Sequence, residues 1–166
     1  SLKKWINLCL YIGFGCIALL LCQSSSPNEG VPIFNAMLMN DSFSYYFKWI
    51  ILISTFSIVL ISNYSKELDR EYSVEFNALI LFALLGMFLM TNSIDLLMIY
   101  LSIELVSIPS YILAGMLKND KKSNEASLKY VIFGSFASGL MLFGLSWLYG
   151  ISGSTNIYEI YKVLAV

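Results

Sequence analysis

The segment from Leu96 to Leu117 reads LLMIYLSIELVSIPSYILAGML and carries one charged residue, Glu104. A helix needs about 20 apolar residues to cross the hydrocarbon core of a membrane, so this segment is long enough to span it. Comparable apolar segments occur elsewhere in the chain. Together they predict five transmembrane helices, near residues 5–22, 45–63, 76–94, 96–117 and 126–150.

The composition of the whole chain agrees with this pattern. Of the 166 residues, 58% are hydrophobic and 13% are charged. Soluble domains carry about 25% charged residues, so the deficit is large. The sequence therefore predicts an all-α membrane protein with about five transmembrane helices.

The composition also excludes several kinds of function. The net charge of −1 provides no basic surface for a nucleic acid backbone. The sequence contains no histidine, which removes the usual general base and most zinc and haem ligands. Three cysteines, Cys9, Cys16 and Cys22, share one apolar segment without CxxC spacing. We expect them to pack as small residues, and we expect no metal site and no cofactor in this chain.

Positive charges fall on one side of the predicted arrangement. With five alternating spans, seven Lys and Arg residues share that side: Lys3, Lys4, Lys66, Arg70, Lys118, Lys121 and Lys122. The opposite loops, 23–44, 92–95 and 152–156, contain none. Because Lys and Arg in short loops stay on the cytoplasmic or matrix side, we expect the N-terminus on that side.

The last residues, 156–166, predict a short amphipathic helix at the membrane surface. Asn156 can cap this helix, with Glu159 three positions later. Four apolar residues then fall on one helical face: Ile157, Ile160, Tyr161 and Leu164.

Glu104 is the charge that lies deepest in the predicted membrane. At about 1.5 Å per residue, it lies about 12 Å from one end of its span and about 20 Å from the other. A carboxylate at that depth costs several kcal/mol unless it is protonated, paired with a cation or hydrated. Such a group is suited to take up and release a proton. The alternative is a permanently protonated glutamate that is bonded to a helix neighbour.

Lys129 is the candidate partner of Glu104. It lies about 6–9 Å inside the next predicted helix. In one interpretation it faces the interior of the bundle and shares a hydrated path with Glu104. In the other it pairs with Glu125 at i, i+4. Spacing fixes the depth of a residue but not its face, so both interpretations stay open.

Three groups of residues, taken together, resemble a known family. They are the run from Ser102 to Tyr111, SIELVSIPSY; the run from Ser123 to Tyr130, SNEASLKY; and then Gly134-Ser-Phe-Ala-Ser-Gly139, Leu142-Phe-Gly144, Leu148-Tyr-Gly150 and Gly153. This ordered set resembles the antiporter-like membrane subunits of proton-pumping NADH:ubiquinone oxidoreductase, respiratory complex I, and among them subunit 2. The resemblance covers residues 76–155, whereas the first two spans match only in hydropathy and placement.

The resemblance implies that Glu104 and Lys129 act in proton translocation. It also implies that NADH, FMN, iron–sulfur clusters and ubiquinone are bound by other subunits. Full-length relatives have two inverted repeats of five helices, each with a broken helix that carries a central lysine. This chain ends before the first broken helix, so we expect the N-terminal part of a split or truncated subunit. The expected partners are other membrane subunits of complex I, including a chain that supplies the remaining helices, and the lipid bilayer.

Two other functions remain as alternatives. One is a structural membrane subunit of the same complex without proton transfer, and the other is a fragment of a stand-alone cation/proton antiporter. For localisation, 19 isoleucines against eight alanines indicate an AT-rich gene such as an organelle genome carries. We expect the mitochondrial inner membrane, with the N-terminus on the matrix side and no transit peptide. The bacterial plasma membrane is the alternative.

Overall fold

The protein is described by a computed structural model that covers residues 2–24, 30–64 and 72–165. The predicted all-α membrane class is confirmed, with one small hairpin added. In chain order the described elements are α1 Leu2–Gln23, β1 Val31–Ile33, β2 Leu38–Asn40, α2 Ser42–Tyr64, α3 Ser73–Asn92, α4 Leu96–Ala114, α5 Lys121–Ser152 and α6 Ile157–Leu164. The predicted loop cations Lys66 and Arg70 lie outside the described residues.

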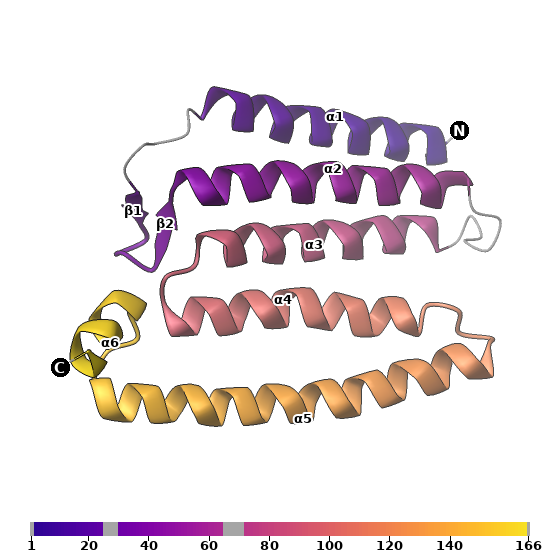
Figure 1. The fold of residues 1–166 in the computed structure, drawn as a ribbon. Coiled ribbons are helices and arrows are strands. Elements are labelled where there is room, and N and C mark those ends of the chain that lie inside the picture. The colour runs from indigo at the N-terminus through magenta and orange to yellow at the C-terminus, as the bar shows by residue number, and fades with distance from the viewer. Residues whose placement is uncertain (1, 25–29, 65–71, 166) are drawn as a thin grey trace.

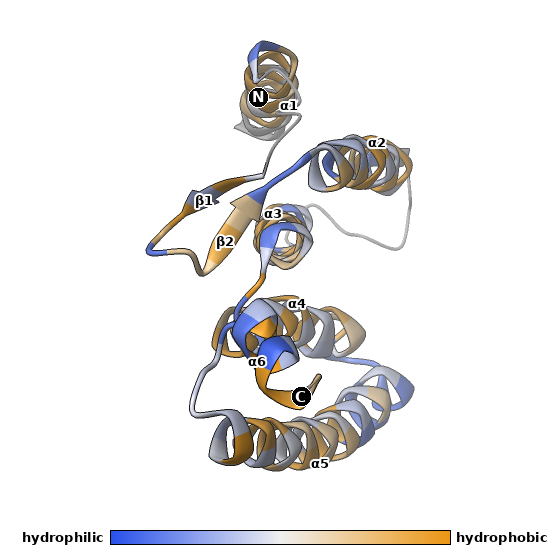
Figure 2. Cartoon of the chain, turned by 60° about the vertical axis from the view of Figure 1, so that its left-hand side comes forward, coloured by the Kyte–Doolittle hydropathy of each residue, from blue (hydrophilic) through white to orange (hydrophobic). Residues whose placement is uncertain are grey.

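The five long helices, α1 to α5, lie side by side in chain order, and each runs antiparallel to the one before it (Figure 1). The N-terminus and the turn between α4 and α5 share one end of this row. The hairpin, the connection between α3 and α4, and α6 share the other end. Figure 2 shows the same row from the side, with α6 lying across the ends of α4 and α5.

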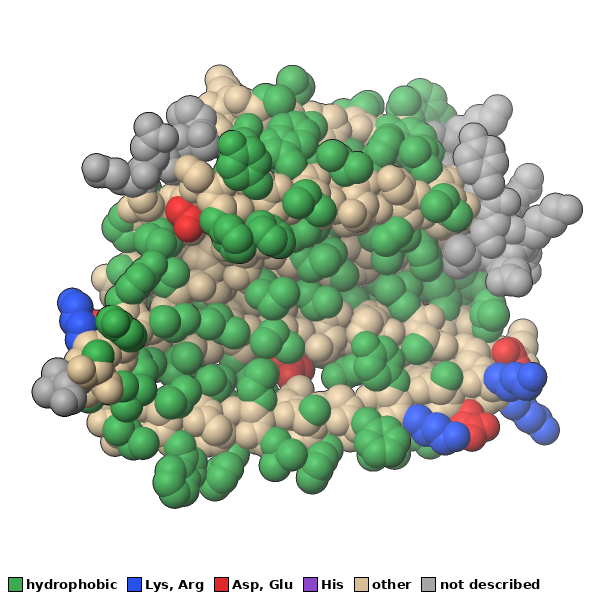
Figure 3. Space-filling view, viewed as in Figure 1, with side chains coloured by type: hydrophobic (Ala, Val, Ile, Leu, Met, Phe, Trp, Pro, Cys, Tyr) green, Lys and Arg blue, Asp and Glu red, His purple; other side chains and the backbone are tan. Residues whose placement is uncertain are grey.

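Four of the described helices, α2 to α5, are long and apolar enough to cross a membrane. The first helix, α1, contributes a shorter apolar stretch, Leu8–Gln23. Hydrophobic side chains cover the middle of the face shown in Figure 3, whereas Lys and Arg side chains lie at its two ends. Lys48 of α2 also directs its charge away from the apolar middle. Its Nζ donates a hydrogen bond to Asn40 Oδ1 of β2 at 3.1 Å. Its charge thus reaches toward the loop end of α2.

The core lies where α1, α2 and α3 meet. It is formed by four buried side chains: Phe14, Leu52, Val59 and Leu84. A polar contact supplements it, because Asn63 Nδ2 of α2 donates to the Tyr11 hydroxyl of α1 at 3.0 Å. Next in the row, α3 and α4 approach closely at Gly86. A Cβ at Gly86 would lie 2.8 Å from Val106 Cγ2 and 3.1 Å from the carbonyl oxygen of Ser102.

The segment 23–44, which the sequence predicts as a plain loop, contains an antiparallel hairpin. Val31 pairs with Asn40 and Ile33 pairs with Leu38. Three consecutive residues of its turn, Phe34, Asn35 and Ala36, have positive φ angles of 52°, 56° and 61°. The hairpin is tied to the helices, because the Ile94 amide donates to the Met37 carbonyl at 3.1 Å.

Asp95 connects two further loops at this end of the molecule. Its buried carboxylate caps α4 by accepting from the Leu97 amide at 2.9 Å, and it accepts from the Thr155 hydroxyl at 2.5 Å. The backbone strengthens this junction, since the Leu96 amide donates to the Thr155 carbonyl at 2.8 Å. The connection between α5 and α6 is therefore fastened to the start of α4.

The predicted Asn156 cap of the last helix is confirmed. Its side chain accepts from the Tyr158 amide at 3.0 Å. Glu159 is linked to the Asn156 amide through the Ser154 hydroxyl. The Glu159 carboxylate accepts a hydrogen bond from this hydroxyl at 2.6 Å, and the hydroxyl oxygen in turn accepts one from the Asn156 amide. On the predicted apolar face, Ile160 is buried and Tyr161 is exposed.

Candidate functional site

Glu104 lies on the side of α4 that faces α5. Leu97, Glu104 and Tyr111 are spaced seven residues apart, so they share one stripe of the helix. Leu97 lines a groove together with Leu145 of α5, and the Tyr111 ring packs against Tyr130 of α5. Glu104 lies between these two contacts and therefore in the seam between α4 and α5.

Glu104 is half-buried as a residue, but the Oε1 atom of its carboxyl is buried and has no hydrogen-bond partner among the described residues. Glu104 is the one acidic residue inside α4, eight residues after Leu96 and ten before Ala114. Figure 3 shows acidic atoms in the middle of the apolar face, between α4 and α5. A buried acceptor without a partner costs about 1–3 kcal/mol, and more if it is charged. A proton, a water molecule or a cation bound at this carboxyl would remove that cost.

The opposite wall of the seam is a single stripe of α5. From Ser127 to Leu145, the half-buried residues of this helix recur every three to seven positions, at Ser127, Gly134, Ser138, Met141 and Leu145. Because Gly134 packs against Tyr111 and Leu145 lies near Leu97, Ser138 and Met141 lie at the level of Glu104.

Lys129 lies outside this stripe. Its Nζ forms an i, i+4 ion pair with Glu125 Oε1 at 2.5 Å, and the two side chains are 64% and 63% exposed. Its neighbour Tyr130 is level with Tyr111, which lies about 10 Å along the helix from Glu104. The structure thus contains the local pair of Lys129 with Glu125 and does not bring Lys129 and Glu104 together.

Sequence reasoning missed the residues that close the seam beside Glu104. The Tyr111 and Tyr130 rings meet edge to face, with centroids 4.7 Å apart. A Cβ at Gly134 would overlap the Tyr111 hydroxyl. The one signal in the sequence for this pairing is that Tyr111 and Tyr130 flank a short turn between two antiparallel helices.

Asn77 of α3 was also missed. It is 3% exposed, and its Oδ1 has no partner among the described residues. A buried amide in a membrane helix is a polar group that needs compensation. It lies near the start of α3, at the end of the row that holds the turn between α4 and α5.

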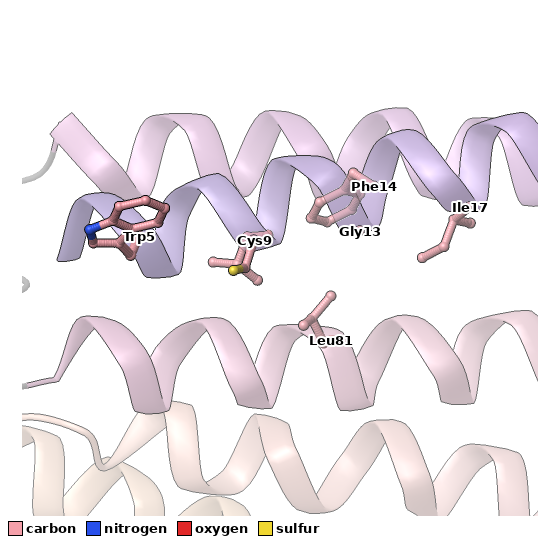
Figure 4. Close-up of a pocket in the computed structure, with 7 residues that line it drawn as sticks. Trp5, Cys9, Gly13, Phe14, Ile17 and Leu81 are labelled. Atoms are coloured by element: carbon pink, nitrogen blue, oxygen red, sulfur yellow. The ribbon is translucent and has the colours of Figure 1, made fainter. Parts of the chain in front are cut away.

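An apolar groove of about 450 Å³ lies on the other side of the molecule, between α1 and α3 (Figure 4). Its wall includes Trp5, Cys9 and Phe14 of α1 and Leu81 of α3. None of its lining residues carries a charge, so it offers no group for proton chemistry. Cys9, Cys16 and Cys22 are free thiols that are exposed on α1, so the predicted packing of these residues is not present in the described structure.

Comparison with known proteins defines the class of this fold. Residues 93–166 match the family described as NADH:quinone oxidoreductase/Mrp antiporter, transmembrane part. The structure superposes on a chain of respiratory complex I from Thermus thermophilus with a TM-score of 0.74 and 23% sequence identity, covering 97% of this chain and 37% of that one. This chain therefore shares its fold with part of a chain of respiratory complex I.

At the level of sequence, this chain is similar to NADH-quinone oxidoreductase subunit N. It is 45% identical to that of Anaeromyxobacter sp. over 150 residues, which cover 88% of this chain and 29% of the relative. It is 48% identical over 134 residues to a subunit N from Chloroherpeton thalassium, covering 79% and 26%. The chain spans less than a third of the length of these curated relatives. They support the antiporter-like class as a resemblance over this part of the chain, and the narrower assignment to subunit 2 stays a prediction.

Proposed function

We propose that this chain forms part of the membrane arm of proton-pumping NADH:quinone oxidoreductase and contributes Glu104 and Lys129 to a proton path. The observation that carries the proposal is the Oε1 atom of Glu104, which is buried at mid-helix and has no partner among the described residues. The similarity to subunit N supports the choice of complex. Redox cofactors, in this proposal, belong to other subunits.

In this proposal Glu104 holds a proton while its carboxyl lacks a cation nearby. A deprotonated carboxylate at this depth would cost several kcal/mol, so loss of the proton requires a compensating positive charge. A cation that approaches Glu104 thus releases its proton, and withdrawal of the cation restores the neutral acid. The seam between α4 and α5 supplies the apolar surroundings that make this coupling strong.

Lys129 supplies a mobile charge in this proposal. Its pair with Glu125 is exposed, and exposed pairs of this kind contribute about 0.3–0.5 kcal/mol. Lys129 can therefore leave Glu125 for another partner at a small cost in free energy. The helices that complete an antiporter-like fold would provide both that partner and the central lysine of the path.

The proposal is tested by Glu104→Gln in the assembled complex. A positioned acid–base group contributes roughly 10²–10⁴-fold to the rate of a proton transfer, so we expect fewer protons translocated per electron while the complex still assembles. The measurement compares proton uptake with NADH oxidation in membrane vesicles, and native gels report assembly.

Glu75→Gln is the matched control, because Glu75 is an exposed glutamate in the first turn of α3. It should leave the ratio of protons to electrons unchanged. An unchanged ratio in Glu104→Gln as well would favour the structural subunit without proton transfer. Co-purification with NADH:quinone reductase activity distinguishes both from a stand-alone antiporter.

The membrane that holds the complex is also a proposal. The isoleucine-rich composition supports the mitochondrial inner membrane, and the bacterial relatives support the plasma membrane. In either case the cation-rich end of the row would face the matrix or cytoplasm. Fractionation of the source cells, followed by detection of the chain, separates the two membranes.

A further inference from the structure

Hydroxyl groups cross the seam between α4 and α5 from its cation-rich end toward Glu104. Ser123 Oγ donates to the Ala114 carbonyl at 2.8 Å, and one helical turn further along α5 Ser127 Oγ donates to the Tyr111 carbonyl at 2.9 Å. The Ser110 hydroxyl then donates to the Tyr130 hydroxyl at 3.2 Å. This end of the seam is therefore polar, although it lies between two apolar helices.

The Tyr111–Tyr130 pair interrupts this polar line. The two rings, one from each helix, meet at 81°, with Tyr111 half-buried and Tyr130 47% exposed. On its far side, the Tyr111 hydroxyl rests against the backbone of Gly134, where even a Cβ would overlap it. The Tyr111 ring is thus held between Tyr130 and Gly134.

Glu104 and Ser107 lie directly beyond this pair. Both share the stripe of α4 that contains Tyr111, at seven and four residues from it. Ser107 is half-buried and its hydroxyl donates to the Ile103 carbonyl at 2.8 Å. The tyrosine pair therefore separates the buried carboxyl from the surface at Lys118, Lys121 and Lys122.

We propose that the Tyr111–Tyr130 pair is a water gate that controls access to Glu104 from the turn between α4 and α5. This proposal rests on the proposed role of Glu104, and it adds the side of the membrane from which the proton reaches Glu104. With the rings packed as in the structure, the seam is closed. Rotation of Tyr111 away from Gly134 opens a continuous path of hydroxyl groups and water between the turn and Glu104. Tyr111 and Tyr130 act on the reaction by admitting or excluding water and do not themselves exchange the proton.

The test is the accessibility of residue 107 in the assembled complex. Ser107→Cys is introduced after Cys9, Cys16 and Cys22 are replaced by Ser, and a membrane-impermeant thiol reagent is added on the side of the turn. With Tyr111 present we expect slow labelling. Tyr111→Ala should raise the labelling rate at least tenfold, whereas Tyr111→Phe, which retains the ring, should leave it low.

Tyr158→Ala is the control, because Tyr158 is an exposed tyrosine of α6 outside the seam. Equal labelling rates in Tyr111→Ala and Tyr158→Ala would overturn the gate. Fast labelling of Ser107→Cys with both tyrosines intact would also overturn it. Gly134→Ala is a second variant, which displaces the Tyr111 ring without deleting it and should also speed labelling.

The labelling result is independent of the proposed role of Glu104. If Glu104→Gln leaves proton translocation intact, the proposed function fails even where the gate is found. If Glu104→Gln abolishes translocation but residue 107 is labelled at one rate in all variants, the gate fails and the proposed function stands.

Discussion

Gly86 and Gly139 are both glycines inside a helix, but only Gly86 lies against another helix. A Cβ at Gly86 would lie 2.8 Å from Val106 Cγ2 and 3.1 Å from the Leu105 backbone, whereas a Cβ at Gly139 would meet nothing within 4 Å. Overpacking of a close contact costs about 1–3 kcal/mol. We therefore expect Gly86→Ala to lower the free energy of unfolding by that amount, measured by thermal unfolding of the chain in detergent.

Gly139→Ala is the matched substitution for this measurement. Alanine is favoured over glycine inside a helix by about 1 kcal/mol, so this variant should be as stable as the parent or more stable. Equal losses in both variants would show that α3 and α4 do not approach each other at Gly86.

At the same scale, the depth of Glu104 could be predicted from the sequence but the face of Lys129 could not. Depth follows from counting residues along an apolar segment. The face depends on which residues of α5 meet α4, and these include Ser123, Ser127 and Tyr130, whose contacts are tertiary. Successive residues of a helix point about 100° apart around its axis. Lys129 and its neighbour Tyr130 therefore lie on different faces of α5, and the sequence does not show which of these faces meets α4.

At the scale of elements, the junction at Asp95 holds α6 against the start of α4. Asp95→Asn keeps one oxygen for the Leu97 amide but replaces the acceptor of the Thr155 hydroxyl by an NH₂ group. A buried hydrogen bond lost in this way costs about 1–3 kcal/mol. We expect lower stability and faster proteolysis between Ser152 and Ile157, which mass spectrometry of the fragments can locate.

Asp120→Asn provides the comparison for Asp95→Asn. Asp120 caps α5 by accepting from the Lys122 amide at 3.1 Å, but it is exposed. Asparagine caps helices about as well as aspartate, so this change should have a small effect. The junction would be contradicted if both variants were cleaved at the rate of the parent.

The hairpin β1–β2 shows where prediction of elements from sequence fails. Its strands have three residues each, which is too short for an alternating pattern to be recognised. Its turn places Phe34, Asn35 and Ala36 at positive φ without a glycine, so the usual turn signal is missing. The hairpin instead depends on tertiary contacts, such as the bond from the Asn156 side chain to the Ala36 carbonyl at 3.2 Å.

At the scale of the whole molecule, the helices form a row in which each long helix packs against its neighbours in the chain (Figure 1). α5 ends this row and contacts α4 through one stripe. Beyond Lys129, the rest of its surface is mostly apolar and includes Phe133, Phe136 and Trp147, all more than 60% exposed. In a membrane this surface meets lipid or other transmembrane helices.

The antiparallel row also fixes which loops share a side of the membrane. The turn between α4 and α5 lies at one end, with Lys118 Nζ 5.8 Å from the centre of the Tyr72 ring. The hairpin lies at the other end, and no Lys or Arg occurs in residues 30–47. Since cations are retained inside, we expect the turn to face the matrix or cytoplasm and the hairpin to face the opposite side.

This topology is tested with single cysteines in a chain whose native cysteines are replaced by Ser. Asn119→Cys lies in the turn and Val31→Cys lies on the exposed strand of the hairpin. In sealed vesicles of known orientation, an impermeant thiol reagent should label Asn119→Cys from the inner side alone and Val31→Cys from the outer side alone. Labelling of both from one side would mean that α2, α3 and α4 do not each cross the membrane. The same reagent, added on the side that labels Asn119→Cys, is the one that must reach residue 107 when Tyr111 is removed, so the topology also fixes the side from which the proposed gate opens.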